Sequence, residues 1–107
     1  MAKYLFTVKY TAEGVKSAKG DGYATRQGIN ERSFEALGGR VEQWFWTAGG
    51  DWDLVGIAEL PPGALATIKT IVDGAGAFAR TSVIELFDSA TMDAAAATTT
   101  TYRAPGQ

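Results

Sequence analysis

A glycine turn between two apolar segments is the feature that most constrains the fold of this chain. Gly49-Gly50 allows backbone angles that other residues avoid, so the chain can reverse direction tightly there. The segment before the turn, residues 40–47, is rich in aromatic side chains, and the segment after it, residues 52–60, is apolar. These two segments predict a β-hairpin with Asp51-Trp52-Asp53 at the entrance of its second strand.

The pattern on either side of the hairpin predicts two more strands and two helical segments. Residues 3–11 alternate between the two faces of a strand, and a glycine-rich break at residues 20–22 separates a short helical turn from a main helix over about 24–37. A second helix is expected over about 63–73 and a last strand over 78–87. The order β-α-β-β-α-β predicts an α+β, ferredoxin-like fold: a four-stranded antiparallel sheet with two helices on one face.

Composition changes sharply after residue 88, which divides the chain into a domain over 1–88 and a tail over 89–107. The tail is rich in alanine and threonine and has few large apolar side chains. Such a composition is typical of a disordered segment in an isolated subunit. The alternative is that a neighbouring subunit holds the tail, with Met92 and Tyr102 as its anchors.

The absence of cysteine and histidine excludes several kinds of chemistry. There can be no disulfide, no thiolate nucleophile and no Ser-His-Asp relay, and the usual haem and zinc ligands are missing. We therefore expect no metal site and no cofactor. The formal net charge is −2 with scattered basic residues, so no nucleic-acid partner is expected.

No apolar run approaches the roughly 18–20 residues that span a bilayer, so no membrane partner is expected. The start of the chain also lacks the apolar stretch of a signal peptide. A cytoplasmic location is the resulting expectation.

Both faces of the predicted hairpin carry apolar side chains. Trp44 and Trp46 alternate with Val41 and Phe45, so one set packs under the helices and the other is left on the open face of the sheet. Exposed aromatic patches of this kind usually mark an interface. We expect the open face to pack against a second copy in a two-fold homodimer, or in a larger oligomer. A monomer with scattered surface aromatics is the alternative.

Four segments in order resemble a known family. An opening strand at residues 4–11 is followed by Glu13-Gly14-Val15-Lys16, the first helix ends in residues 37–41, and an aromatic strand at 44–47 precedes Gly50-Asp51-Trp52-Asp53. With these segments the chain resembles the GYD domain family of small bacterial proteins, a branch of the dimeric α/β-barrel superfamily. The likeness spans about residues 4–87, and Trp52 stands where the family has the tyrosine of its name.

The resemblance implies a dimeric α/β-barrel fold and a homodimer, but no particular reaction. Relatives in the wider superfamily include haem-dependent enzymes, cofactor-free oxygenases and ligand-sensing domains. Haem ligation through a histidine does not carry over, because this chain has none.

Six residues are candidates for a ligand site at the sheet face. Aromatic side chains suit a flat ligand, Gly56 leaves space in a strand interior, and a helical asparagine offers a polar contact. The candidates are Trp44, Trp46, Trp52, Asp53, Gly56 and Asn30. Each also has a structural reading: packing for the tryptophans, a local hydrogen bond for the asparagine, and a turn cap for Asp53. Possible ionic partners of Asp53 are Arg26, Arg32, Arg40 and Arg80.

Three functions remain open on these residues. The first is a homo-oligomeric protein that binds a small apolar or aromatic ligand without catalysis. The second is a cofactor-free oxygenase or isomerase in which Asp53 is the base and Trp52, Asn30 or Arg26 orients the substrate. The third is a structural assembly subunit whose tail straps neighbouring copies together. Whether the chain is an enzyme is left open by the sequence.

Overall fold

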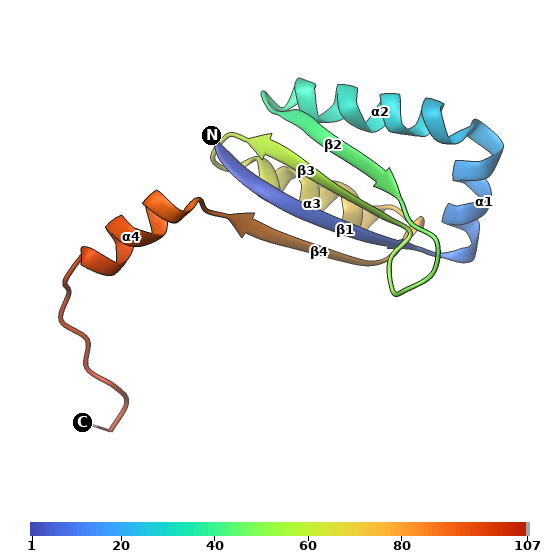
Figure 1. The fold of residues 1–107 in the computed structure, drawn as a ribbon. Coiled ribbons are helices and arrows are strands. Elements are labelled where there is room, and N and C mark those ends of the chain that lie inside the picture. The colour runs from blue at the N-terminus through green and yellow to red at the C-terminus, as the bar shows by residue number, and fades with distance from the viewer. Residues whose placement is uncertain (107) are drawn as a thin grey trace.

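The chain forms one antiparallel sheet with helices packed along one of its faces, in a computed structural model that describes residues 1–106 (Figure 1). The elements in chain order are β1 (Ala2–Tyr10), α1 (Ala12–Asp21), α2 (Tyr23–Ala36), β2 (Arg40–Trp46), β3 (Leu54–Leu60), α3 (Ala64–Gly74), β4 (Phe78–Leu86) and α4 (Ser89–Ala97).

The sheet has the strand order β2-β3-β1-β4, and every neighbouring pair is antiparallel. β1 is therefore central, with Phe6 opposite Gly56 of β3 on one side and opposite Val83 of β4 on the other. Side chains that face each other across these pairs share a face of the sheet. The register thus places Phe6, Gly56 and Val83 on one face.

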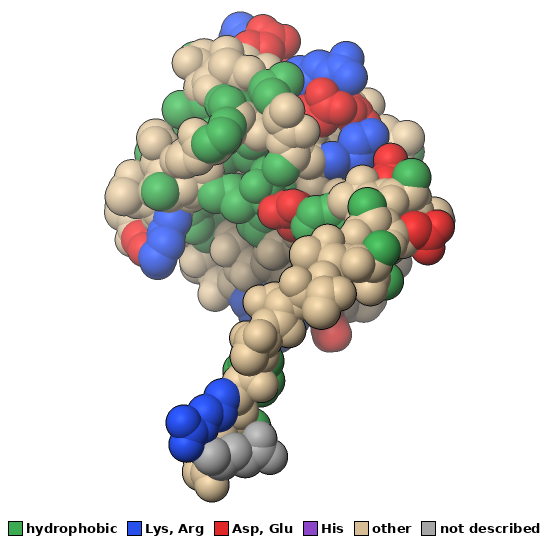
Figure 2. Space-filling model, turned by 90° about the vertical axis from the view of Figure 1, so that its left-hand side faces the viewer, with side chains coloured by type: hydrophobic (Ala, Val, Ile, Leu, Met, Phe, Trp, Pro, Cys, Tyr) green, Lys and Arg blue, Asp and Glu red, His purple; other side chains and the backbone are tan. Residues whose placement is uncertain are grey.

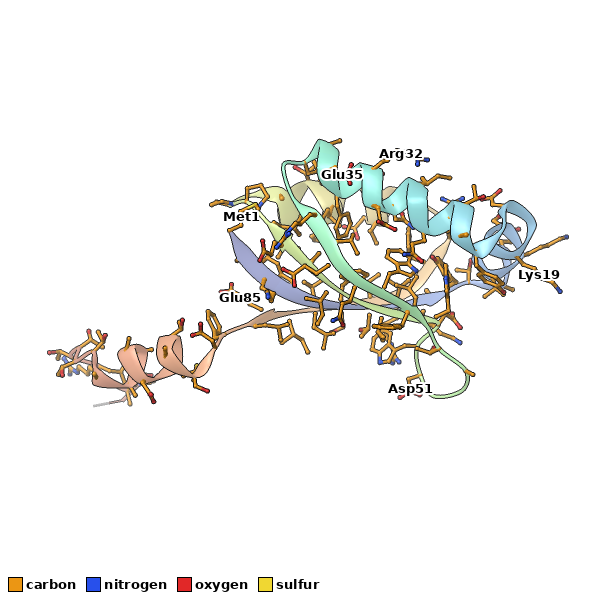
Figure 3. All side chains as sticks on the ribbon, turned by 45° about the horizontal axis from the view of Figure 1, so that its top comes forward. Met1, Lys19, Arg32, Glu35, Asp51 and Glu85 are labelled. Carbon is orange, nitrogen blue, oxygen red and sulfur yellow. The ribbon has the colours of Figure 1, made fainter. Side chains whose placement is uncertain are left out.

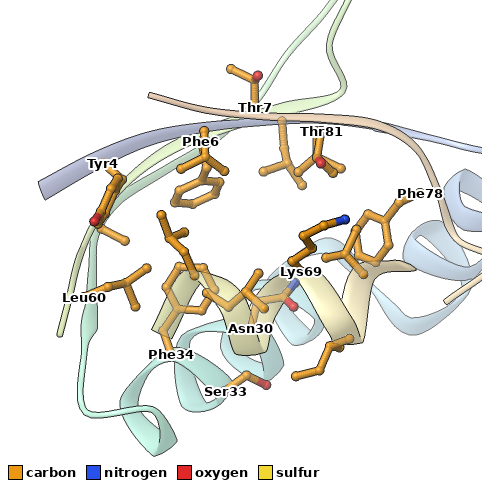
Figure 4. Close-up of a pocket in the computed structure, with 18 of the residues that line it drawn as sticks. Tyr4, Phe6, Thr7, Asn30, Ser33, Phe34, Leu60, Lys69, Phe78 and Thr81 are labelled. Atoms are coloured by element: carbon orange, nitrogen blue, oxygen red, sulfur yellow. The ribbon is translucent and has the colours of Figure 1, made fainter. Parts of the chain in front are cut away.

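Helices α2 and α3 both lie against this face, which we call the covered face (Figure 4). The alternation in β1 and β3 explains why: Phe6 and Tyr10 of β1 and Leu54 and Ala58 of β3 are buried and form one core cluster. Phe34 of α2 packs against this cluster, with its ring centroid 5.6 Å from that of Phe6.

The structure confirms the predicted α+β class, the four-stranded antiparallel sheet and the two helices on one face. The element order departs from a strict ferredoxin-like β-α-β-β-α-β pattern, because two helices fill the first crossover and α4 follows β4. The break between α1 and α2 falls at Gly22, whose φ of 96° is easily reached only by glycine. The second hairpin strand begins at Leu54, two residues later than predicted.

The segment after β4 leaves the body of the molecule, as Figure 1 shows for α4 and the chain that follows it. Its first half is a helix, not the disordered chain expected from composition. Asp88 caps α4 by accepting a hydrogen bond from the Thr91 N–H at 2.7 Å, and every residue of α4 is exposed. The radius of gyration is 17.0 Å, against about 13 Å for a compact chain of 100 residues, which reflects this extension.

None of the helices among residues 1–106 has the length and apolar character needed to cross a membrane. The longest of them, α2, has 14 residues.

Candidate functional site

A cavity of about 630 Å³ lies between the covered face of the sheet and helices α2 and α3. We call it the main cavity. In Figure 4 the strands form its roof and the two helices its floor, with Phe6 and Phe78 directed into it from the sheet and Phe34 from α2. Its apolar lining residues are Tyr4, Phe6, Val8, Tyr10, Phe34, Ala36, Leu37, Trp44, Leu54, Ala58, Leu60, Leu65, Ile68, Ile71, Val72, Phe78 and Val83.

Helix α3 contributes one apolar stripe to the floor of the main cavity. Leu65, Ile68 and Val72 recur at the spacing that brings them to one side of a helix, and all three are half-buried. The helix starts directly after Pro61-Pro62-Gly63, where Gly63 has a φ of 84°. α3 makes few close contacts with the strands, and the main cavity lies between them.

Exposed lining residues mark one edge of the main cavity between α3 and β4, and we call this edge its mouth. The lining residues there are exposed: Lys69 and Asp73 on α3, and Thr81 and Val83 on β4, the last with 44% of its surface accessible. Figure 2 shows hydrophobic side chains gathered around a hollow at the end of the body from which α4 leaves. A small molecule could therefore reach the apolar interior from solvent.

The polar residues in the lining of the main cavity are Thr7, Asn30, Ser33, Lys69, Asp73, Thr81 and Ser82. Asn30 and Ser33 approach from α2, and Ser33 already donates a hydrogen bond to the Ile29 carbonyl at 3.0 Å. Lys69 and Asp73 on α3 form an ion pair at 2.6 Å, and Thr81 faces the cavity from β4 (Figure 4). Such walls suit a ligand that is mostly apolar, with polar contacts at its ends.

Two of the six predicted site residues, Trp44 and Asn30, line the main cavity. The Trp44 ring packs against Phe6 and Trp46, with both centroid distances 5.7 Å. Its indole Nε1 is buried and has no hydrogen-bond partner among the described residues. Trp44 therefore offers the cavity an aromatic wall.

Gly56 does not open space for a ligand, although the sequence predicted that it would. The ring of Phe6 fills the position above it: a Cβ built on Gly56 would lie 2.2 Å from the Phe6 Cζ. The residue opposite Gly56 thus uses the room that the missing side chain leaves.

Trp46 and Asp53 line a different, smaller hollow of about 380 Å³ beside α1 and the start of α2. Tyr10 and Tyr23 complete its aromatic wall, with the Tyr23 ring 4.9 Å from that of Trp46. Burial raises the pKa of the Tyr10 phenol; the charge of Arg26 opposes this shift and that of Asp53 adds to it.

Asp53 connects the hairpin turn to the end of β1. Its Oδ2 accepts a hydrogen bond from the Tyr10 N–H at 2.8 Å, and its Oδ1 lies 3.4 Å from the Lys9 Nζ. Its own N–H donates to the Val8 carbonyl at 2.8 Å. The ionic partner of Asp53 is therefore Lys9, and the sequence-based expectation of an arginine was wrong.

Trp52 lies in the hairpin turn and lines neither hollow. Its ring lies under the guanidinium of Arg80, 4.6 Å from the Arg80 Cζ, and its carbonyl accepts a hydrogen bond from the Thr47 hydroxyl. Asp51 is at the exposed tip of the same turn (Figure 3). The Asp51-Trp52-Asp53 segment is thus held by turn and strand contacts and is not part of the main cavity.

Several residues of the main cavity were not among the predicted site residues. The sequence placed Phe6 in a predicted strand and Phe34 and Ile68 in predicted helices, without singling out any of them or Lys69 as a site residue. One signal was present in the sequence: Lys69 lies beside the apolar stripe of α3.

A comparison with known protein families matches residues 4–96 to the GYD domain. This range contains β2, β3, β4 and both helices of the covered face, and all of β1 except its first two residues, and it includes Gly50-Asp51-Trp52-Asp53. No curated protein matches the chain. The family match covers most of the sequence and agrees with the resemblance carried by the four segments, and on that basis the chain belongs to the GYD domain family.

Proposed function

We propose that this protein binds a small apolar or aromatic molecule in the main cavity, without catalysing a reaction on it. The observation that carries the proposal is the cavity itself, about 630 Å³ with largely apolar walls. Protein interiors are close-packed and hold few voids larger than a water molecule. Ligand pockets typically measure about 300–1,000 Å³ and combine apolar walls with a few polar groups.

The position of Asp53 favours binding over catalysis. In the enzymatic alternative Asp53 is the base, but its carboxylate contacts Tyr10 and Lys9 and lines the small hollow. A general base must reach the proton that it removes, directly or through one water. Asp53 is not among the residues that line the main cavity, so a ligand bound there would not meet it.

Titration with a neutral fluorescent probe, N-phenylnaphthylamine, tests this proposal. Its emission rises when it leaves water for an apolar site, so binding to the cavity gives a saturable increase. Val83→Trp places a large ring at the mouth and is expected to weaken binding at least about tenfold, which corresponds to about 1.4 kcal/mol.

Val15→Trp is the matched control, because it introduces the same ring at an exposed position of α1 that does not line the main cavity. The two positions have similar exposure, 44% for Val83 and 41% for Val15. We expect Val15→Trp to bind the probe like the unchanged protein. Absence of saturable binding, or equal losses in both variants, would contradict the proposal.

We further propose that the protein acts as a homodimer formed through the open face. Leu5 lies opposite Ile57 on one side and Ile84 on the other, so three apolar side chains form a row across that face. Phe45 and Ile84 are 57% and 54% exposed. Contiguous apolar surface of this kind is typical of an interface, and a two-fold axis would bury it on both copies at once.

A role as an assembly subunit is the second candidate, and the position of the tail favours it. α4 is exposed over its whole length and extends from the body (Figure 1). Truncation after Asp88 should then lower the number of subunits per assembly, as measured by light scattering. An unchanged number of subunits would exclude assembly through the tail, and the proposal of ligand binding would still stand.

A further inference from the structure

The main cavity has one basic residue in its lining, Lys69, and one acidic residue, Asp73. Every other lining residue is apolar or uncharged. Both charged residues belong to α3 and lie at the mouth, where a polar end of a bound molecule would meet solvent. Any contact between a charged side chain of the lining and the polar end of a ligand would therefore come from Lys69 or Asp73.

Lys69 is placed to reach a ligand that enters between α3 and β4. Figure 4 shows its side chain rising from α3 into the cavity, in the direction of Thr81 on the opposite wall. Lys69 follows Ile68 in α3 and lies three residues before Val72, a spacing at which its methylene groups extend the apolar floor while the ammonium stays accessible. Lys69 and Thr81 together offer donors to an acceptor at the mouth.

The ion pair between Lys69 and Asp73 does not prevent this role. The side chains are 74% and 61% exposed, and the pair spans one helical turn at 2.6 Å. Pairs of this type change a helix equilibrium by only about twofold, because solvent screens them and ordering two long side chains costs entropy. A ligand anion can therefore replace Asp73 as the partner of the Lys69 ammonium at little cost in free energy.

We propose, resting on the function proposed above, that the ligand of the main cavity is an amphipathic monoanion. Its apolar or aromatic body occupies the space between Phe6, Phe34 and Phe78, and its carboxylate or phenolate oxygen pairs with the Lys69 ammonium at the mouth. The charge-assisted hydrogen bond is stronger than one between neutral groups. An anion in this orientation keeps its charge near water and needs no buried counter-ion.

Isothermal titration with naphthoate and with neutral naphthamide tests the inference, since the two probes have the same ring and nearly the same size. The unchanged protein should bind naphthoate about three- to tenfold more tightly, a preference that falls as salt is added. Lys69→Met keeps an apolar stem and should remove the preference, because naphthoate loses a charge-assisted contact and its affinity falls further than that of naphthamide. Asp73→Asn removes the competing carboxylate and should raise naphthoate affinity about twofold.

Lys16→Met is the matched control, because it removes the same charge from an exposed position of α1 that lines neither hollow. It should leave the preference intact. If both probes bind but Lys69→Met and Lys16→Met behave alike, the assignment of Lys69 is wrong while the cavity still binds ligands. If neither probe binds and N-phenylnaphthylamine also fails, the proposed function itself is wrong.

Discussion

The carboxylate of Asp53 accepts a hydrogen bond from the backbone N–H of Tyr10 at 2.8 Å, between residues 43 positions apart in the chain. The register of β1 with β4 shifts between Lys9 and Tyr10, at the same place. A side chain from the hairpin turn thus partners a backbone donor where the strand ladder is irregular. The Asp53 carboxylate, which the sequence offered as a candidate catalytic base, thus joins the hairpin turn to β1.

Replacing Asp53 should therefore lower stability in a graded way. Asp53→Ala leaves the half-buried Tyr10 N–H without its partner and should reduce the free energy of unfolding in urea by about 1–2 kcal/mol. Asp53→Asn keeps an oxygen acceptor and should cost less than about 1 kcal/mol. Neither change should weaken N-phenylnaphthylamine binding under conditions in which both variants are fully folded. Equal losses for the two variants would contradict the hydrogen-bond account.

The contact between Phe6 and Gly56 predicts that β3 tolerates no side chain at this position. In Gly56→Ala the new Cβ would meet the Phe6 ring at 2.2 Å and the Gln43 carbonyl oxygen at 2.7 Å. Overpacking of this kind typically costs about 1–3 kcal/mol, measurable by urea unfolding. Gly20→Ala is the control: it lies in α1 with open space around its Cβ and should stabilise by about 0.5–1 kcal/mol. A neutral Gly56→Ala would contradict the register.

The buried phenol of Tyr10 predicts a loss of stability in alkali. Its folded pKa is raised above the ordinary value of 10.0, so the folded protein holds a proton that the unfolded chain has released. The free energy of unfolding should therefore fall as pH rises from about 10 to the folded pKa, and less so in Tyr10→Phe. Phenolate absorbance should show one tyrosine that titrates above the ordinary pKa of 10.0, and Tyr10→Phe should remove this titration. If the phenolate titration that is missing in Tyr10→Phe has the ordinary pKa of a tyrosine, the raised pKa of Tyr10 is disproved.

The proposed dimer predicts that one charge on the open face is enough to separate the subunits. Phe45→Glu places a carboxylate on the open face, where Phe45 lies opposite Val55, and should convert a dimer to a monomer in sedimentation equilibrium, because two copies of it would be buried at a two-fold interface. Ile71→Glu is the comparison, since Ile71 is also exposed but lies on α3. A monomer for the unchanged protein, or dissociation by both variants, would contradict the interface.

The elements of the fold could be predicted because their signals are local. The alternation over residues 3–11 predicted that Tyr4, Phe6, Val8 and Tyr10 share one face of the strand. The structure makes this the covered face, with Phe6 and Tyr10 buried. The register shift between Val41 and Gln43 could not be read in this way. It puts Val41 opposite Ala58 on the covered face, where simple alternation placed it on the other side.

The candidate site was less predictable because it depends on how α3 is placed over the sheet. Trp44 and Asn30 were found, since aromatic and polar residues on an apolar face are visible in the sequence. Asp53 was misread because its partner, the Tyr10 N–H, is a backbone group brought close only by tertiary structure. The helix of the tail had a local signal that composition concealed: Asp88 precedes an alanine-rich run and caps it.

The most direct test of the central claim is an isotope-filtered NOE experiment on labelled protein with unlabelled N-phenylnaphthylamine. It reports which side chains lie beside the bound molecule, independently of affinity. The account predicts cross-peaks from the ligand to Phe6, Ile68 and Phe78, which line the main cavity from both layers. Cross-peaks confined to Phe45 and Ile84, on the open face of the sheet, would contradict it.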